Sequence, residues 1–184
     1  MFKTSALLVL LCVGAQAQTF DALAQTVLAN FPETRHFGVV CDYGSNQEAV
    51  QELALALGGG SRITVADVKV AENVAKGAQT LSAAGAQMMV LLPRDRFVRD
   101  GAYYATVAIH ALPVSIPAVG TMRASIENGA VLAQGPDTGG QLVLTPNLRQ
   151  GYIGKSWILF HGKMSLRPIP PRGEASIQVL HTAR

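Results

Sequence analysis

The chain has 184 residues, with 15 basic and 12 acidic side chains and a formal net charge of +3. This length is enough for one domain with a full apolar core, and it is too short for two domains of ordinary size. The Lys and Arg residues are scattered singly along the chain and form no basic stripe, which argues against a nucleic-acid-binding protein.

The N-terminus has the pattern of a secretory signal peptide. Its start is positively charged, residues 6–13 are apolar, and residues 15–17 (Ala-Gln-Ala) have the small-x-small pattern of a cleavage site. The apolar run is about eight residues long, compared with the roughly 20 that a membrane-spanning helix needs. We therefore expect a signal peptide over residues 1–17 with cleavage after Ala17, a periplasmic or secreted protein, and one mature domain over residues 18–184 without a membrane span.

The Cys and His residues predict no catalytic or metal centre. Removal of the leader would leave Cys41 without a disulfide partner, and its apolar neighbours predict a buried, inert thiol. The four His residues lie singly on different predicted elements and have no metal-ligand spacing. We therefore expect no metal, no cofactor and no enzyme activity.

After the leader, predicted helices alternate with predicted strands. Helical spacing of apolar residues predicts a helix over residues 20–31 that ends at Pro32. The apolar run at residues 36–41 predicts a strand that is buried on both faces. A capping-box pattern at residues 45–48 predicts the start of the next helix, which the glycines at 58–60 end.

The same alternation continues along the chain. The next predicted elements are a strand at 62–68, a helix at 71–84, a strand at 87–92, a helix at 95–112, and strands at 115–119 and 130–134. Strands that alternate with helices of about 10 to 15 residues form parallel sheets with right-handed crossovers. We therefore predict a doubly wound, mostly parallel α/β sheet.

The last fifty residues depart from this alternation. Residues 137–140 read as a turn into a strand at 141–145, which adds an antiparallel hairpin to the sheet. A helix at 147–160 follows, and a proline-rich linker at 168–171 leads to a final strand at 176–180.

Polar residues follow the predicted strands where a parallel sheet binds ligands. In such sheets ligands lie outside the carboxyl ends of the strands, where helix N-termini present free N–H groups. Arg94 adds a planar fork of donors that suits a carboxylate, whereas Ser45 and Asp95 could equally serve as ordinary helix caps. The candidate ligand contacts are Asp42, Tyr43, Ser45, Asn46, Arg94, Asp95, Thr121 and Asp137.

The succession of these segments resembles the second lobe of ABC-transporter substrate-binding proteins with a periplasmic-binding type I fold. The likeness rests on residues 22–40, 45–48, 92–95 (Leu-Pro-Arg-Asp), 116–119 (Ile-Pro-Ala-Val), 127–137 and 169–184. It implies an exported, non-catalytic domain that binds a small polar ligand or a partner protein through its strand-end loops. An ABC permease or another exported protein is the implied partner. Because the family closes two lobes around its ligand, a single lobe would leave apolar surface for a partner or for a homodimer.

Two alternatives remain open. Residues 37–41 and 129–147 distantly resemble the small periplasmic regulators of membrane diguanylate cyclases (YfiR-like), which are single α/β domains. The other alternative is a hydrolase-type enzyme in which Asp42, Asp95 or Asp137 acts as general acid or base near Arg94. That enzyme would need a carboxylate with a perturbed pKa in a closed pocket.

Overall fold

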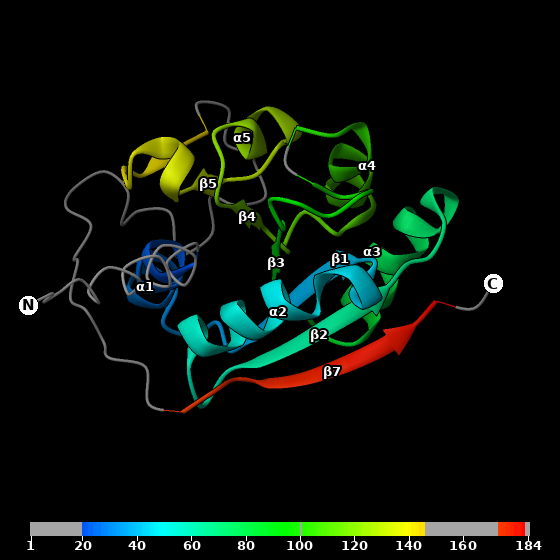
Figure 1. The fold of residues 1–184 in the computed structure, drawn as a ribbon, viewed down its shortest axis with the longest axis horizontal. Coiled ribbons are helices and arrows are strands. Elements are labelled where there is room, and N and C mark those ends of the chain that lie inside the picture. Colours follow the sequence, from blue (N-terminus) through cyan, green and yellow to red (C-terminus); the bar gives the residue numbers. More distant parts are fainter. Residues whose placement is uncertain (1–19, 100, 146–172, 183–184) are drawn as a thin grey trace, which may run out of the picture.

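The computed structural model describes residues 20–99, 101–145 and 173–182. Three predictions lie outside these residues: the leader at 1–17, the helix at 147–160 and the proline-rich linker at 168–171. The described chain has an α/β fold built on one seven-stranded sheet (Figure 1). All neighbouring strands are parallel except one antiparallel pair at an edge of the sheet.

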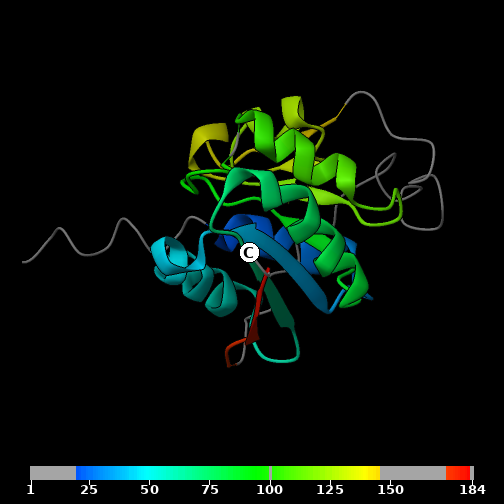
Figure 2. The same cartoon turned by 90° about the vertical axis from the view of Figure 1, so that its right-hand side faces the viewer.

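The strands lie in the order β6-β5-β4-β3-β1-β2-β7. Their bounds are β1 (His36–Cys41), β2 (Arg62–Asp67), β3 (Met88–Val90), β4 (Ala118–Gly120), β5 (Leu132–Ala133), β6 (Val143–Leu144) and β7 (Ser176–His181). The register places Cys41 beside Asp67 and Asp67 beside His181. The ends of β1, β2 and β7 therefore meet at one edge of the sheet. Figure 2 shows β7 beside β2.

The helices are α1 (Asp21–Asn30), α2 (Tyr43–Leu57), α3 (Val74–Ala83), α4 (Tyr103–Ala111) and α5 (Ala124–Asn128), with two short 3-10 helices, η1 (Ala71–Asn73) and η2 (Pro136–Thr138). Helix α1 precedes the first strand, and helices α2 to α5 each connect two consecutive strands. None of the helices in the described ranges combines the length and the apolar character that crossing a bilayer requires.

Both faces of β1 are covered by apolar side chains. Phe37, Val39 and Cys41 belong to one apolar cluster with residues of α1 and α2, whereas Val40 belongs to a second cluster with residues of α3 and α4. Successive side chains of a strand point to opposite faces, so the two clusters lie on opposite sides of β1. All six residues of β1 are buried, which confirms the prediction for residues 36–41.

The antiparallel hairpin predicted after residue 137 is present. In β5 and β6, Leu132 lies opposite Leu144 and Ala133 lies opposite Val143 in antiparallel register. The final strand is also present, as β7, and it pairs in parallel with β2 of the same chain.

The predicted helix over residues 95–112 is wrong in its first half. Oδ1 of Asp95 accepts hydrogen bonds from the backbone N–H groups of Phe97 (2.8 Å) and Val98 (2.7 Å), which holds a turn in place of a helix. Gly101 has a φ of 81°, a value that breaks a helix. Helix α4 therefore begins only at Tyr103.

The predicted capping box at residues 45–48 is also wrong. Helix α2 begins at Tyr43, two residues earlier, and the side chain of its N-cap residue, Asp42, makes no capping hydrogen bond. The Ser45 hydroxyl instead donates to Oδ2 of Asp42 at 3.1 Å. The helix is kinked at Asn46, where φ is −127° and ψ is 16°. The predicted end of this helix is confirmed, because Gly58 follows its last residue with a φ of 71°.

Candidate functional site

A cleft of about 630 Å³ lies at the carboxyl ends of the central strands. Its walls come from the first half of α2 and from the loops after β3, β4 and β5. From β1 the chain adds β2 toward one edge of the sheet, and it then adds β3, β4 and β5 toward the other edge. The direction in which strands are added therefore reverses between β1 and β3. Parallel sheets open a crevice at such a reversal.

Five of the eight predicted ligand contacts line this cleft: Ser45, Asn46, Arg94, Thr121 and Asp137. They come from α2 and from three separate loops, and the carboxyl ends of neighbouring strands bring them together. Apolar walls complete the cleft, contributed by Phe20, Ala49, Pro93, Met122 and Pro136.

Thr121 carries an unsatisfied polar group in the wall of the cleft. The residue is 1% exposed, and its hydroxyl has no hydrogen-bond partner among the described residues. A buried hydroxyl without a partner costs roughly 1–3 kcal/mol. Gly135 packs directly on Thr121, since a Cβ at Gly135 would collide with the Thr121 carbonyl oxygen. The backbone after β5 thus lies tightly against this wall.

Arg94 and Asp137 are exposed at the cleft. Within the described ranges the Arg94 guanidinium forms no hydrogen bond and no ion pair, so its donors are available to a ligand. One oxygen of Asp137 accepts the backbone N–H of Arg123 at 2.9 Å, which fixes the loop after β5 against the loop after β4.

Two further carboxylates, Glu48 and Glu52, line the cleft and were not predicted as site residues. They lie four residues apart on α2 and therefore on the same side of the helix. Burial raises the pKa of the Glu52 carboxyl, and the negative charge of Glu48 adds to the effect. Arg94 acts in the opposite direction, without forming an ion pair to Glu52 in the described part of the chain.

Asp95 lies beneath the cleft and acts as a junction between segments. It is fully buried, and Oδ2 accepts the backbone N–H of Asp42 at 2.9 Å and Nδ2 of Asn46 at 2.8 Å. Its other oxygen holds the turn at Phe97 and Val98. With two donors on each oxygen, Asp95 holds the walls in position and has little capacity left for a ligand.

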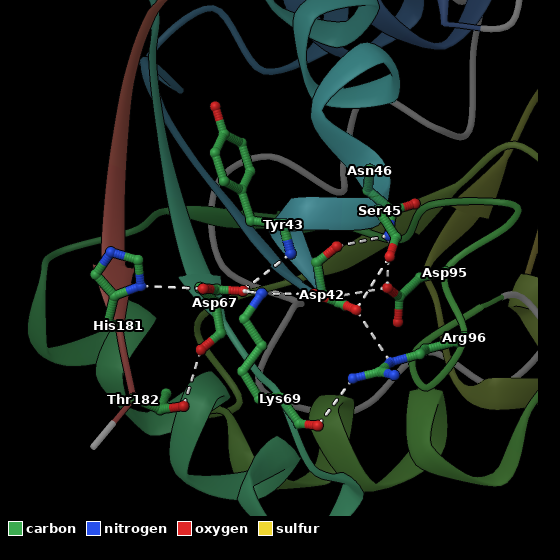
Figure 3. Close-up of polar contacts among 10 residues, drawn as sticks. All are labelled: Asp42, Tyr43, Ser45, Asn46, Asp67, Lys69, Asp95, Arg96, His181 and Thr182. Carbon is green, nitrogen blue, oxygen red and sulfur yellow. Dashed lines mark hydrogen bonds and ion pairs between the residues drawn. The ribbon is translucent and has the colours of Figure 1, made fainter. Parts of the chain in front are cut away.

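Asp42 belongs to an ionic cluster beside the cleft, which Figure 3 shows and which we define as Asp42, Asp67, Lys69, Arg96 and His181. Nζ of Lys69 lies 2.6 Å from Oδ1 of Asp42 and 2.9 Å from Oδ1 of Asp67. Nε of Arg96 lies 3.1 Å from Oδ2 of Asp42, and Nδ1 of His181 lies 3.0 Å from Oδ2 of Asp67. The cluster ties the ends of β1, β2 and β7 together.

The carboxyl groups of this cluster are held in the charged form. The hydrogen bond from Lys69 lowers the pKa of Asp42, against the effect of burial. Burial opposes the charge of Asp67, but hydrogen bonds from Lys69, the Tyr43 N–H and His181 outweigh it and lower the pKa of Asp67. The hydrogen bonds that Lys69 donates to Asp42 and Asp67 in turn raise the pKa of Lys69.

Tyr43 is placed by its backbone. Its N–H donates to Oδ1 of Asp67 at 3.0 Å, and its ring points away from the ionic cluster (Figure 3). The ring packs against the apolar cluster of α1 and α2. Asp42, Tyr43 and Asp95 are therefore the three predicted contacts that the structure places outside the lining of the cleft.

The ionic cluster contains residues that the sequence interpretation missed. Asp67 is the last residue of β2, but the strand was predicted to run to residue 68, so the rule that selected polar residues after strands passed over Asp67. No comparable signal exists for His181, which reaches the cluster only because β7 pairs with β2.

Cys41 is the last residue of β1. It is fully buried, and burial together with the charges of Asp95, Asp67 and Asp42 raises the pKa of its thiol. Among the residues that the structure describes, no three His, Cys, Asp or Glu side chains are grouped as they would be around a metal ion.

Comparison with known proteins adds no relative. No protein-family model, no curated protein and no solved structure matches this chain.

Proposed function

We propose that this protein is an exported, non-catalytic binding domain related to the substrate-binding proteins of ABC transporters. Its ligand is small and polar and occupies the cleft at the carboxyl ends of the strands. The observation that carries the proposal is that Ser45, Asn46, Arg94, Thr121 and Asp137, far apart in the sequence, line one cleft. Its volume of about 630 Å³ suits a small molecule, since ligand pockets span about 300–1,000 Å³.

The proposal includes a doubly wound sheet. Support comes from the two apolar clusters on opposite sides of β1 and from the reversal of strand order between β1 and β3. Sheets of this kind bind ligands at that reversal, which is where the cleft lies. The succession of sequence segments that resembles a substrate-binding lobe is the second support.

The surroundings of Asp42, Asp95 and Asp137 favour binding over catalysis by these three carboxylates. A general acid or base needs a free oxygen near the substrate and a pKa near the working pH. Asp42 is ion-paired and its pKa is lowered, and both oxygens of Asp95 already accept two hydrogen bonds each. Asp137 is exposed at the cleft and does not have a closed environment. These features argue against the hydrolase alternative.

A thermal-shift screen tests the binding function. The purified protein is melted in the presence of amino acids, small anions, sugars and amines, because a ligand that binds only the folded chain raises the melting temperature. A concentration-dependent rise with one class of compound is the expected result. A native-mass measurement in parallel distinguishes a small-molecule role from a role in which a second copy or an exported partner covers the strand-end loops.

A matched pair of variants locates the ligand. Ala49→Trp should fill the cleft, because Ala49 is a half-buried lining residue on α2. Ala83→Trp adds the same side chain at an exposed position of α3 outside the cleft. The shift should disappear in the first variant and persist in the second. No shift with any compound, or a shift that survives Ala49→Trp, contradicts the proposal.

A further inference from the structure

The charges of the cleft are unbalanced. Its ionisable lining residues are three carboxylates (Glu48, Glu52 and Asp137) and one guanidinium (Arg94), so the formal charge of the lining is −2. In the neighbouring ionic cluster, by contrast, Asp42 and Asp67 both pair with Lys69. The protein therefore neutralises its carboxylates beside the cleft and leaves those inside it without an ion-pair partner in the described residues.

The two glutamates repel each other. Like charges four residues apart on a helix destabilise it by a few tenths of a kcal/mol, about as much as an opposite-charge pair would stabilise it. Glu52 is half-buried, which weakens the screening by water, and Asp21 at the start of α1 adds a third negative charge. A cation placed between these groups would remove the repulsion.

The Thr121 hydroxyl provides a second and independent indication. It is buried in the wall of the same cleft and has no partner in the described part of the chain, and a hydroxyl oxygen can accept a hydrogen bond. Because its oxygen is shielded from water, contact with a ligand needs a rotation of the side chain. An alkylammonium group carries a positive charge, which complements the excess of carboxylates. It also has three N–H donors, which complement an unpaired acceptor.

We infer that the ligand of the cleft is a small organic cation with a protonated primary amine, and that Glu52 is the residue that selects for its charge. The inference rests on the proposed binding function and goes beyond it by naming the chemical class. Arg94 at the rim limits the excess of negative charge and leaves room for a neutral or anionic part of the ligand.

Calorimetric titration with putrescine, a four-carbon dication, tests the inference, and succinate, a four-carbon dianion, is the matched control. Putrescine should bind, with an affinity that falls as salt is added, because opposite charges are screened. Succinate should not bind. If succinate or a neutral sugar binds and putrescine does not, the charge selection is overturned while the binding function stays intact. Absence of binding by every compound in the thermal-shift screen overturns both.

Two variants separate a ligand-binding role of these groups from a structural one. Glu52→Gln should weaken putrescine binding at least about tenfold, because a charge-assisted hydrogen bond is lost. The same variant should melt about 1 to 3 °C higher than the unchanged protein in the absence of ligand, since it removes the repulsion. This difference in melting temperature should vanish below about pH 4.5, where the Glu52 carboxyl of the unchanged protein is protonated in both the folded and the unfolded chain.

Thr121→Val should likewise stabilise the free protein and weaken binding about threefold to tenfold, because the buried hydroxyl is replaced by a methyl group of the same shape. Glu127→Gln, at an exposed position of α5 outside the cleft, is the control and should change neither property. If Glu52→Gln lowers the melting temperature, or leaves putrescine binding unchanged, the assignment of Glu52 is wrong.

Discussion

Asp95 shows how one buried side chain can set the geometry of a site without touching its ligand. It joins the end of β1, the first turn of α2 and the loop after β3, through two accepted hydrogen bonds on each oxygen. At 0% exposure, water cannot replace a lost partner. This carboxylate thus bonds the side chain of Asn46, the residue at the kink of α2, and also holds the turn that follows Arg94.

Asp95→Asn should therefore destabilise the protein strongly. The Asn amide has an NH₂ group in place of one carboxylate oxygen, and both oxygens accept N–H groups. At least one buried N–H donor would therefore face another donor and lose its hydrogen bond. We expect the free energy of unfolding to fall by roughly 3 kcal/mol, measured by urea denaturation. Glu33→Gln in the exposed loop after α1 should change it by less than about 0.5 kcal/mol. Equal effects of the two substitutions would show that the four bonds contribute nothing.

Lys69 should shape the pH dependence of stability. A carboxyl whose pKa is lowered by folding stabilises the folded chain above its ordinary pKa, here 3.8, and this contribution is lost as the pH falls through the lower folded value. The raised pKa of Lys69 affects stability at alkaline pH. Its contribution is full below 10.5 and is lost as the pH rises through the folded value.

Lys69→Met should therefore lower stability at neutral pH and flatten both limbs of the pH profile, below about pH 4 and above about pH 10. Urea denaturation across pH 2 to 11 measures the effect. Arg99→Met, which removes an exposed positive charge outside the ionic cluster, should shift the profile without flattening it. A Lys69→Met profile parallel to that of the unchanged protein would contradict the role of the cluster.

At the scale of elements, the contact between α3 and the sheet depends on a glycine. A Cβ at Gly77 would lie 2.9 Å from Cγ2 of Val68 and 3.2 Å from Cγ1 of Val40. Both neighbours are β-branched and stiff, so they cannot turn aside easily. The close approach of α3 to β1 and to the end of β2 therefore requires the absence of a side chain.

Gly77→Ala should destabilise the protein by about 1–2 kcal/mol even though Ala is the better helix former by about 1 kcal/mol, because overpacking outweighs the gain in propensity. Thermal and urea unfolding both measure the loss. Gln79→Ala, at an exposed position two residues further along the same helix, reports propensity alone and should have a small effect. A stabilised Gly77→Ala variant would mean that α3 moves away from the sheet at little cost.

The elements that the sequence predicted correctly are those with long apolar runs or sharp ends. Residues 36–41 are apolar throughout, and Gly58 marks the end of α2 clearly. The helix over residues 95–112 was overextended because apolar spacing alone does not reveal that Asp95 prefers to bond the N–H groups of Phe97 and Val98. The capping box failed for a similar reason, since Ser45 bonds to Asp42 in place of the helix N–H groups.

At the scale of the whole molecule, the sequence predicted which residues stand at strand ends but not which strands are neighbours. Ser45, Arg94, Thr121 and Asp137 were found because parallel strands place their carboxyl ends at one edge. The order of the strands decides which strand-end residues lie close together. The pairing of β2 with β7 brings Asp67 and His181 together. Such pairing depends on contacts between residues more than one hundred positions apart.

The strand order also predicts how stability is distributed. β1 and β2 form the longest ladders and are bonded on both sides, whereas β6 pairs two residues at an edge. Hydrogen exchange should therefore be slowest in β1 and β2 and fastest in β6, because local opening there breaks few contacts. Mass spectrometry of peptic fragments measures this gradient. Uniform protection across the sheet would contradict it.

The position of Cys41 gives the chain an internal reporter of its own opening. Its side chain is fully buried in the apolar cluster that α1 and α2 form against the sheet, and nearby carboxylates disfavour the thiolate, so an alkylating reagent can react only after this layer opens. The speed at which this thiol is labelled would then measure how often the helices uncover this face of the sheet. An experimenter could follow that event in crude mixtures without attaching any dye or tag.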